Sequence, residues 1–251
     1  MNENIHRTAV VDPLAKIAND VEIGPFSIIH ANVVLAEGCK IAAYCELGVK
    51  SPHSDGSPLI IEKNSLIRSH SVFYESSRFG ENLVTGHRVT VRENTIAGKN
   101  LQIGTLGDIQ GDCVIGDYVR FQSNVCIGKM SNIGNFVWIF PYVVLTNDPN
   151  PPSTILKGVT VGDYVVISTM SVILPGTIIG KGAVIAAHSS LKGKAEPGML
   201  YKGSPAEKFC KASRIKLQDS TRRSSYPWTS HFSRGYPDDV VNAWRNEDDK
   251  L

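Results

Sequence analysis

The sequence has little that would attach it to a membrane or to nucleic acid. No run of apolar residues approaches the eighteen needed to cross a bilayer, and the opening MNENIHRTAV holds no signal-peptide core. Basic and acidic residues number 26 and 24 and are scattered, so no positively charged surface for nucleic acid is indicated. We therefore expect neither a membrane nor a nucleic acid as a partner.

Cysteine is scarce as well. The five cysteines form no CxxC pair and no disulfide framework, which favours a reducing, cytoplasmic location. With 251 residues, of which 42% are hydrophobic, the chain is long enough to bury a core in one or two domains.

What the sequence does have is a repeat, in which a branched apolar residue recurs at every sixth position. Such a period fits neither an amphipathic helix nor an alternating strand, but it fits short strands joined by tight corners, as in a parallel β-helix. Small residues fill the corners, and three of them are expected to be buried thiols rather than nucleophiles: Cys39, Cys45 and Cys113. Branched apolar residues mark seven hexads over Val11–Leu47, fifteen over Ile61–Leu145 and six over Val161–Leu191.

These hexads resemble those of the hexapeptide-repeat acyltransferases, which implies an all-β fold, a left-handed parallel β-helix with 18 residues per coil. We expect about nine coils within residues 1–200, ending after Leu191, with loop insertions at 49–60 and 147–160. The first insertion is either functional or a tolerated excursion. Residues 201–251 are expected to hold a helix, within KFCKASRIKLQD, and an aromatic-rich tail that either packs on the prism or a neighbouring subunit, or is disordered.

A polar cluster stands in the middle of the repeat, in TGHRVTVRENTIAGKN. Residues 18 apart stack on one face of an 18-residue coil, so Ser69 is expected beside His87, and His70 beside Arg88. We expect the side chains of this cluster to point outward. Its members are His87, Arg88, Arg92, Glu93 and Asn94.

Three interpretations of the cluster compete. It is an ordinary solvated face, a metal site, or an acyl-transfer site. The γ-class carbonic anhydrases, which share the expected fold, bind zinc with three histidines, two of them five residues apart. The seven histidines of this chain, at 6, 30, 53, 70, 87, 188 and 231, include no such pair. We therefore favour acyl transfer and expect no metal.

Attack of an amine on a thioester needs a neutral amine, donors for the oxyanion and an acceptor for the amine proton. His87 with Glu93 and Asn94 is expected to supply a base or proton relay, unless the departing thiolate takes the proton itself. Arg88 and Arg92 either hold a pyrophosphate or pair with surface carboxylates.

Two segments, GHRVTVRENTIAG and VWIFPYVVLTNDPNPP, resemble the dTDP-amino-sugar N-acyltransferases. The resemblance implies a homotrimer with active sites in the grooves between subunits, with acyl-CoA beside the C-terminal coils and the nucleotide sugar nearer the middle. The resemblance implies that the nucleotide sugar contacts Ser69, His70, Arg88, Arg92, Asn147 and Asp148. The resemblance implies that CoA contacts Ser168, Ala186, Ala187, Lys192 and Lys202. The superfamily often has Gly-Ala-Gly-Ser-Val where this chain has AAHSS, with His188, and this difference affects the CoA contacts.

The first fifty residues resemble a different group, the UDP-N-acetylglucosamine O-acyltransferases of lipid A synthesis. The Ala-x-x-Ala-His-Asp segment that carries the catalytic histidine of that group has no counterpart here, nor does its long C-terminal helical domain. The sequence thus predicts transfer of an acyl group, most simply acetyl from acetyl-CoA, to a nucleotide-linked deoxyamino sugar for bacterial surface polysaccharide. A sugar O-acyltransferase and a non-catalytic β-helix scaffold remain as alternatives.

Overall fold

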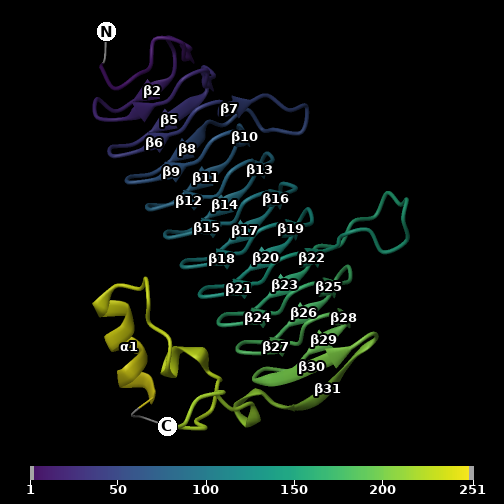
Figure 1. The fold of residues 1–251 in the computed structure, drawn as a ribbon. Helices are drawn as coiled ribbons and strands as arrows, with labels where there is room; N and C mark the ends of the chain where they lie inside the picture. The colour runs from purple at the N-terminus through teal and green to yellow at the C-terminus, as the bar shows by residue number, and fades with distance from the viewer. Residues whose placement is uncertain (1–2, 249–251) are drawn as a thin grey trace.

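The computed structural model describes residues 3–248. The chain winds into a left-handed parallel β-helix, a triangular prism with three sheets as its faces (Figure 1). Each strand pairs in parallel with the strand one coil further along, as Val10–Val11 does with Ile28–Ile29. The all-β fold predicted from the hexads is confirmed.

The strands of each sheet follow one another at every third position of the chain. The first sheet contains β1 (Val10–Val11), β4 (Ile28–Ile29), β7 (Glu46–Val49), β10 (Val72–Tyr74), β13 (Thr90–Val91), β16 (Asp108–Ile109), β19 (Cys126–Ile127), β22 (Val144–Leu145), β25 (Val172–Ile173) and β28 (Ser190–Leu191). The second sheet contains β2 (Lys16–Ile17), β5 (Val33–Leu35), β8 (Leu59–Ile61), β11 (Arg78–Phe79), β14 (Ile96–Ala97), β17 (Val114–Ile115), β20 (Asn132–Ile133), β23 (Thr160–Val161), β26 (Ile178–Ile179) and β29 (Lys194–Ala195). The third sheet contains β3 (Glu22–Ile23), β6 (Lys40–Ile41), β9 (Leu66–Ile67), β12 (Val84–Thr85), β15 (Gln102–Ile103), β18 (Arg120–Phe121), β21 (Trp138–Ile139), β24 (Val166–Ile167), β27 (Val184–Ile185), β30 (Met199–Gly203) and β31 (Ala206–Lys211).

The helix is longer than the hexad count predicted. The sheets have 10, 10 and 11 strands, so about nine coils was an underestimate. The prism does not end after Leu191, because β29 and β30 continue the parallel pairing with β26 and β27. These last two strands lack the branched residue that marks a hexad, since Ala195 and Tyr201 occupy the inward positions. Apolar spacing alone therefore did not reveal them.

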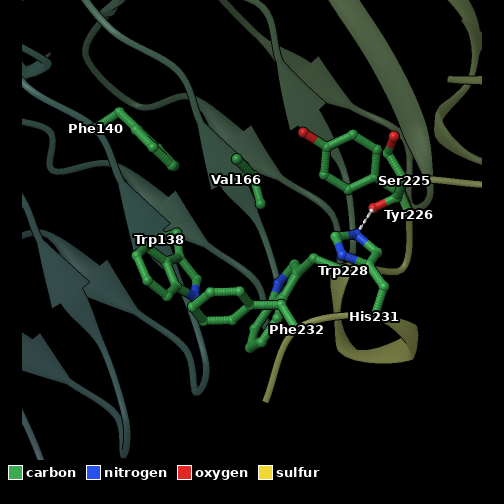
Figure 2. Close-up of a pocket in the computed structure, with 8 residues that line it drawn as sticks. All are labelled: Trp138, Phe140, Val166, Ser225, Tyr226, Trp228, His231 and Phe232. Carbon is green, nitrogen blue, oxygen red and sulfur yellow. Dashed lines mark hydrogen bonds between the residues drawn. The ribbon is translucent and has the colours of Figure 1, made fainter. Parts of the chain in front are cut away.

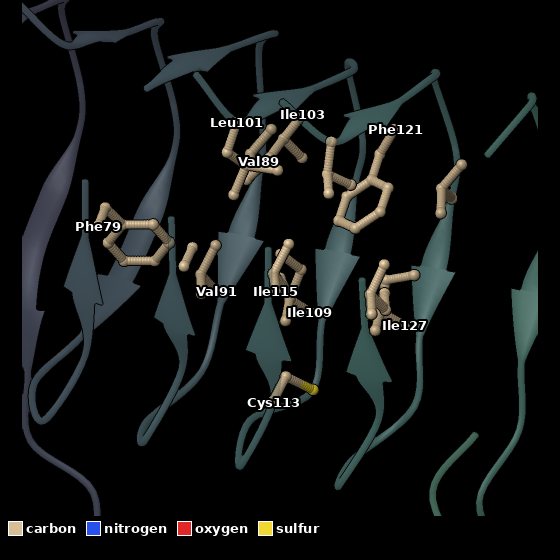
Figure 3. Close-up of a cluster of buried hydrophobic side chains, with 14 of the residues drawn as sticks. Phe79, Val89, Val91, Leu101, Ile103, Ile109, Cys113, Ile115, Phe121 and Ile127 are labelled. Atoms are coloured by element: carbon tan, nitrogen blue, oxygen red, sulfur yellow. The ribbon is translucent and has the colours of Figure 1, made fainter. Parts of the chain in front are cut away.

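The interior is filled by the large residue of each hexad. Val91, Ile109 and Ile127 of the first sheet are fully buried one coil apart, and Phe79 of the second sheet belongs to the same buried cluster (Figure 3). Removing such side chains from water stabilises the fold by roughly 1.5–3 kcal/mol each, before the entropy of ordering them is subtracted.

The three predicted corner cysteines are buried, as expected. Cys39, Cys45 and Cys113 are at most 1% exposed. Burial raises the pKa of each thiol, that of Cys113 to about 11. At neutral pH these groups are neutral core side chains.

The prism has three edges, which we name by what they carry. The His edge holds the turns from the third sheet to the first and includes His87. The loop edge joins the first sheet to the second and carries both insertions, between β7 and β8 and between β22 and β23. The tail edge joins the second sheet to the third. Figure 1 shows both excursions on one side of the prism and the C-terminal segment on the other.

Each turn needs one residue with positive φ, and many of these residues are neither Gly nor Asn. On the His edge they include Phe26, Tyr44 and His70, whose φ values are 58°, 59° and 63°. Holding a side chain in this left-handed region costs on the order of 1–2 kcal/mol. Stacking offsets this cost, because the rings of successive coils lie 5.1 Å and 5.0 Å apart.

The segment after the prism is not the predicted helix over KFCKASRIKLQD. Ala206–Lys211 forms β31, antiparallel to β30, and a 3-10 turn, η1 (Ala212–Arg214), follows. A second 3-10 turn, η2 (Trp228–Ser230), precedes the α-helix α1 (Asp238–Asp248). No helix within residues 3–248 is long and apolar enough to cross a bilayer.

The aromatic tail packs back on the prism, which was one of the two outcomes expected for it. Trp228, Tyr236 and Trp244 are buried against the outer face of the third sheet and the tail edge. The guanidinium of Arg120 lies between the rings of Trp138, at 4.8 Å, and Tyr236, at 4.3 Å. The same guanidinium donates a hydrogen bond of 3.0 Å to the carbonyl of Gly235, so the tail is held by both apolar and polar contacts.

Candidate functional site

The predicted site residues fall on two edges of the prism. Six consecutive extended residues span at most about 20 Å, and each face of the prism separates two such edges. The His edge carries Ser69, His70, His87, Arg88, Ser168, Ala186 and Ala187. The loop edge carries Arg92, Glu93, Asn94, Asn147, Asp148 and Lys192. Lys202 lies in β30, where its ammonium is 3.4 Å from the centre of the exposed Phe209 ring.

His87 is exposed on the His edge and is held in place by the coils before and after it. Its Nδ1 shares a hydrogen bond of 2.8 Å with the hydroxyl of Ser69, and its backbone N–H donates to Thr105 Oγ1 at 3.3 Å. Within residues 3–248, no hydrogen bond is formed by Nε2. An imidazole fixed through one nitrogen and open at the other is suited to accept a proton from a bound nucleophile.

The other residues of the His edge present a mixed surface. His70 stacks on Tyr44 with ring centres 5.0 Å apart, so it is the end of an aromatic ladder. Arg88 is exposed and forms no ion pair with any described side chain, which leaves its guanidinium free for an anion. Five large side chains along this edge are each between 47% and 53% exposed: Phe26, Tyr44, Leu106, Tyr142 and Met170.

Glu93 does not point into solvent, contrary to our expectation. Its side chain is 0% exposed, because the insertion between β7 and β8 folds back over this part of the loop edge. The amide of Asn94 donates to the carbonyl of His53 in that insertion at 3.0 Å, and to Asp112 at 2.8 Å. The insertion covers residues that hexad position alone places outside.

The charges around Glu93 keep it ionised. Burial raises the pKa of the Glu93 carboxyl, but backbone hydrogen bonding and the Arg92 guanidinium, 3.2 Å away, outweigh this and hold the pKa below its usual value. Lys129 adds a second positive charge at 3.8 Å and also pairs with Asp112 at 2.9 Å. The buried, charged Glu93 carboxylate lies on the loop edge and His87 on the His edge, so we infer that Glu93 and Asn94 anchor the insertion rather than relay protons. Of the two roles expected for Arg92, pairing with a carboxylate is the one seen here, and its partner is Glu93.

The second insertion forms a cavity on the loop edge. The space of about 480 Å³ is lined by Asn147, Asp148 and Lys192, so the structure brings these three predicted residues together. Pro149, Pro151 and Pro175 supply rigid, apolar walls.

Asp148 itself mainly shapes the insertion. Its carboxylate accepts hydrogen bonds from the backbone N–H of Ser153 at 2.9 Å, from the hydroxyl of Ser153 at 2.8 Å and from the N–H of Asn150 at 3.0 Å. Desolvation raises the pKa of Asp148, but these bonds outweigh it and the pKa lies below the ordinary value. The carboxylate is therefore a fixed negative charge at the rim of the cavity.

Sequence reasoning missed two residues of this cavity, Gln110 and Cys126. Cys126 lies one coil before Val144 in the column of Val144, and Gln110 lies two coils before Thr146 in the column of Thr146. These two columns were the available signal. Burial and the neighbouring Asp108 raise the pKa of Cys126 to about 11, so its thiol is not a ready nucleophile.

No group of three or more His, Cys, Asp or Glu side chains in the described part of the chain is arranged to hold a metal ion. The polar side chains of the two edges are instead organised by hydrogen bonds and ion pairs with one another.

The repeat is also recognised in comparison with known proteins. The family described as bacterial transferase hexapeptide (six repeats) matches residues 4–48. The match covers the first coils of the prism, and the same spacing of six residues continues through the later coils.

Two curated relatives share longer segments with this chain. It is 31% identical over 131 residues to an acyl-[acyl-carrier-protein]–UDP-N-acetylglucosamine O-acyltransferase of Saccharophagus degradans, covering 52% of this chain and 48% of the relative. It is 27% identical over 197 residues to the bifunctional protein GlmU of Exiguobacterium sp., covering 76% of this chain and 41% of the relative. The chain thus spans less than half the length of either relative.

Among solved structures, the UDP-N-acetylglucosamine acyltransferase of Arabidopsis has the same fold. The TM-score is 0.53 at 17% sequence identity, and the match covers 95% of this chain and 91% of the Arabidopsis chain. At this identity the likeness establishes the fold alone.

Proposed function

We propose that this hexapeptide-repeat protein transfers an acyl group from a thioester to a nucleotide-linked sugar. The observation that carries the proposal is His87, an exposed imidazole with Nδ1 fixed by Ser69 and Nε2 open. The S. degradans relative is named for acyl transfer to a UDP-linked sugar, which supports the proposal.

In the proposed reaction His87 accepts the proton of the attacking amine or hydroxyl as this group adds to the thioester carbonyl. The tetrahedral adduct then expels the thiolate, which takes a proton from the imidazolium and leaves as the thiol. Arg88, one residue away on the same edge, is positioned to contact the pyrophosphate of the acceptor. Ser168, Ala186 and Ala187 continue this edge towards the C-terminal coils and are proposed to contact the thioester carrier.

We propose that the working unit is a homotrimer. Within one prism, His87 and the cavity of the second insertion lie on different edges, and a groove between two prisms brings unlike edges together. The five half-exposed large side chains of the His edge support burial against another copy, because apolar side chains gathered along one surface favour an interface. All five cysteines are free thiols, which supports the proposal of a reducing, cytoplasmic location.

Two pairs of acyl donor and sugar acceptor fit this proposal, and an experiment must distinguish between them. The Thr-Asn-Asp insertion, Asn147 and Asp148 included, favours acetyl transfer from acetyl-CoA to the amine of a dTDP- or UDP-linked deoxyamino sugar for surface polysaccharide, with Lys192 and Lys202 near the CoA. The names of the relatives favour O-acylation of UDP-N-acetylglucosamine from an acyl carrier protein.

The test is a matrix of donors and acceptors with mass-spectrometric detection of the acylated sugar. Acetyl-CoA and acyl-[acyl-carrier-protein] are each combined with dTDP- and UDP-amino sugars and with UDP-N-acetylglucosamine. We expect one donor class and one acceptor class to give product. Absence of product in every combination, together with no rise in unfolding temperature on adding CoA, favours a non-catalytic scaffold.

A further inference from the structure

An open apolar pocket lies between the tail and the third sheet, and none of the predicted site residues lines it. It has a volume of about 210 Å³ and is lined by Trp138, Phe140 and Val166 of the prism and by Trp228 and Phe232 of the tail. Figure 2 shows these side chains surrounding the space. We name it the tail pocket. Its volume is below the roughly 300–1,000 Å³ of whole-ligand sites, so it fits one group of a larger molecule.

The tail pocket contains one hydrogen-bond donor with no acceptor. Trp228 is 6% exposed, and its indole Nε1 has no hydrogen-bond partner among residues 3–248. In Figure 2 this nitrogen lies between Val166 and Phe232. The neighbouring Trp138 differs, because its Nε1 donates to the hydroxyl of Tyr236 at 3.1 Å. A buried donor left unpaired is costly, and a ligand acceptor in the pocket removes that cost.

The lining selects a neutral, flat group. It includes no Asp, Glu, Lys or Arg, and the Nε2 of His231 is engaged with the carbonyl of Ser225 at 2.9 Å. A nucleobase meets these conditions, because it is uncharged, has faces that stack on aromatic rings and carries ring-nitrogen or carbonyl acceptors. An acyl chain has no planar face to use the aromatic walls.

The surroundings fit the remainder of a nucleotide. Phe140 stands on the His edge in line with Ser168 and Ala186, one and two coils before them. A neighbouring cavity of about 490 Å³ shares the wall residue Tyr226 and is lined by Lys181 and Lys211, which carry the charge that phosphates need. We propose that the tail pocket binds the nucleobase of one of the two nucleotide substrates, the adenine of CoA or the pyrimidine of the nucleotide sugar. This identification of the ligand rests on the proposed function.

The test measures binding without turnover. Adenosine, uridine and thymidine are titrated in ligand-observed saturation-transfer NMR against the full chain and two variants. Trp228→Phe removes the unpaired N–H but keeps an aromatic wall, and we expect it to weaken nucleoside binding about 5–10-fold, the value of one neutral hydrogen bond. Tyr118→Phe is the matched control, because Tyr118 belongs to the same aromatic cluster but lines neither the tail pocket nor the neighbouring cavity. Circular dichroism melting shows that both variants fold.

Binding of adenosine assigns the pocket to CoA, and binding of uridine or thymidine assigns it to the sugar nucleotide. The proposal is overturned if no nucleoside binds, if both variants weaken binding equally, or if hexanoate displaces the nucleoside and itself depends on Trp228. Nucleoside binding without acyl transfer would leave the pocket assigned and remove the proposed function. Acyl transfer without nucleoside binding would support the proposed function and remove the assignment of the pocket.

Discussion

The hydroxyl of Ser69 lies 2.8 Å from Nδ1 of His87, one coil further along the same edge. Because strands of neighbouring coils are about 4.8 Å apart, residues at equivalent positions meet directly, and the repeat itself aligns the imidazole with its partner. Replacement of His87 by Ala is expected to lower kcat by roughly 10²–10⁴ if it is the general base.

Ser69→Ala is expected to have a smaller effect than His87→Ala, because it removes orientation and leaves the base. We expect a drop in kcat of about 3–10-fold, equivalent to one neutral hydrogen bond, with recovery in Ser69→Thr. His6→Ala serves as the control in steady-state assays, because among residues 3–248 the exposed His6 side chain bonds only Thr8. A drop of only a few-fold for His87→Ala would instead identify the departing thiolate as the proton acceptor.

Glu93→Gln tests the interpretation of Glu93 as an anchor. Loss of the buried charge leaves Arg92 and Lys129 without their shared partner, and we expect a loss of about 3 kcal/mol in unfolding free energy at pH 7. Hydrogen exchange of residues 50–58 should accelerate in the variant. Glu207→Gln, on the exposed side of β31, is the control and should change stability little.

The stability difference between the wild type and Glu93→Gln is expected to depend on pH. The folded pKa of Glu93 lies below its unfolded value near 4.5, so its contribution is complete above that pH and is lost as pH falls towards the folded pKa. The difference in melting temperature between the wild type and Glu93→Gln should therefore be constant from pH 8 to 6 and shrink below about pH 4.5. A difference that grows on acidification would contradict the charged, anchoring role.

Asp148→Ala is expected to loosen the second insertion. It removes the acceptors for two backbone N–H groups and one hydroxyl that hold the turn of the insertion. We expect faster proteolysis between residues 149 and 157 and a raised KM for one substrate. Asp148→Asn retains one carbonyl acceptor and should lie between the wild type and the alanine variant. An unchanged cleavage rate would show that the prolines alone hold the insertion.

Arg120→Ala should detach the tail from the prism. The substitution removes two cation–π contacts and the bond to Gly235, and we expect a loss of roughly 2–3 kcal/mol with a smaller near-ultraviolet signal from the tryptophans. Arg78→Ala is the matched control, since Arg78 makes an exposed pair with Glu62 worth at most about 1 kcal/mol.

The hexad spacing predicted which residues fill the core, because each coil needs one large inward residue per face. The same spacing predicted the contact of Ser69 with His87, 18 residues later, and the burial of Cys113 at the small position of a hexad. The extent of the prism did not, because Ala195 and Tyr201 occupy inward positions without the expected branched side chain. The predicted helix after residue 207 was wrong, since β31 pairs with β30 instead.

Sequence order by itself determined the fold, the core and the neighbours within each column, because these depend on spacings of 6 and 18 residues. Tertiary structure decided the grouping of the polar residues. His87 and Glu93 are close in sequence, yet a corner of the prism sends one to the His edge and the other beneath a folded insertion. Likewise only the return of the tail onto the third sheet enclosed the unpaired indole of Trp228, because that contact joins residues about ninety positions apart, far beyond the repeat.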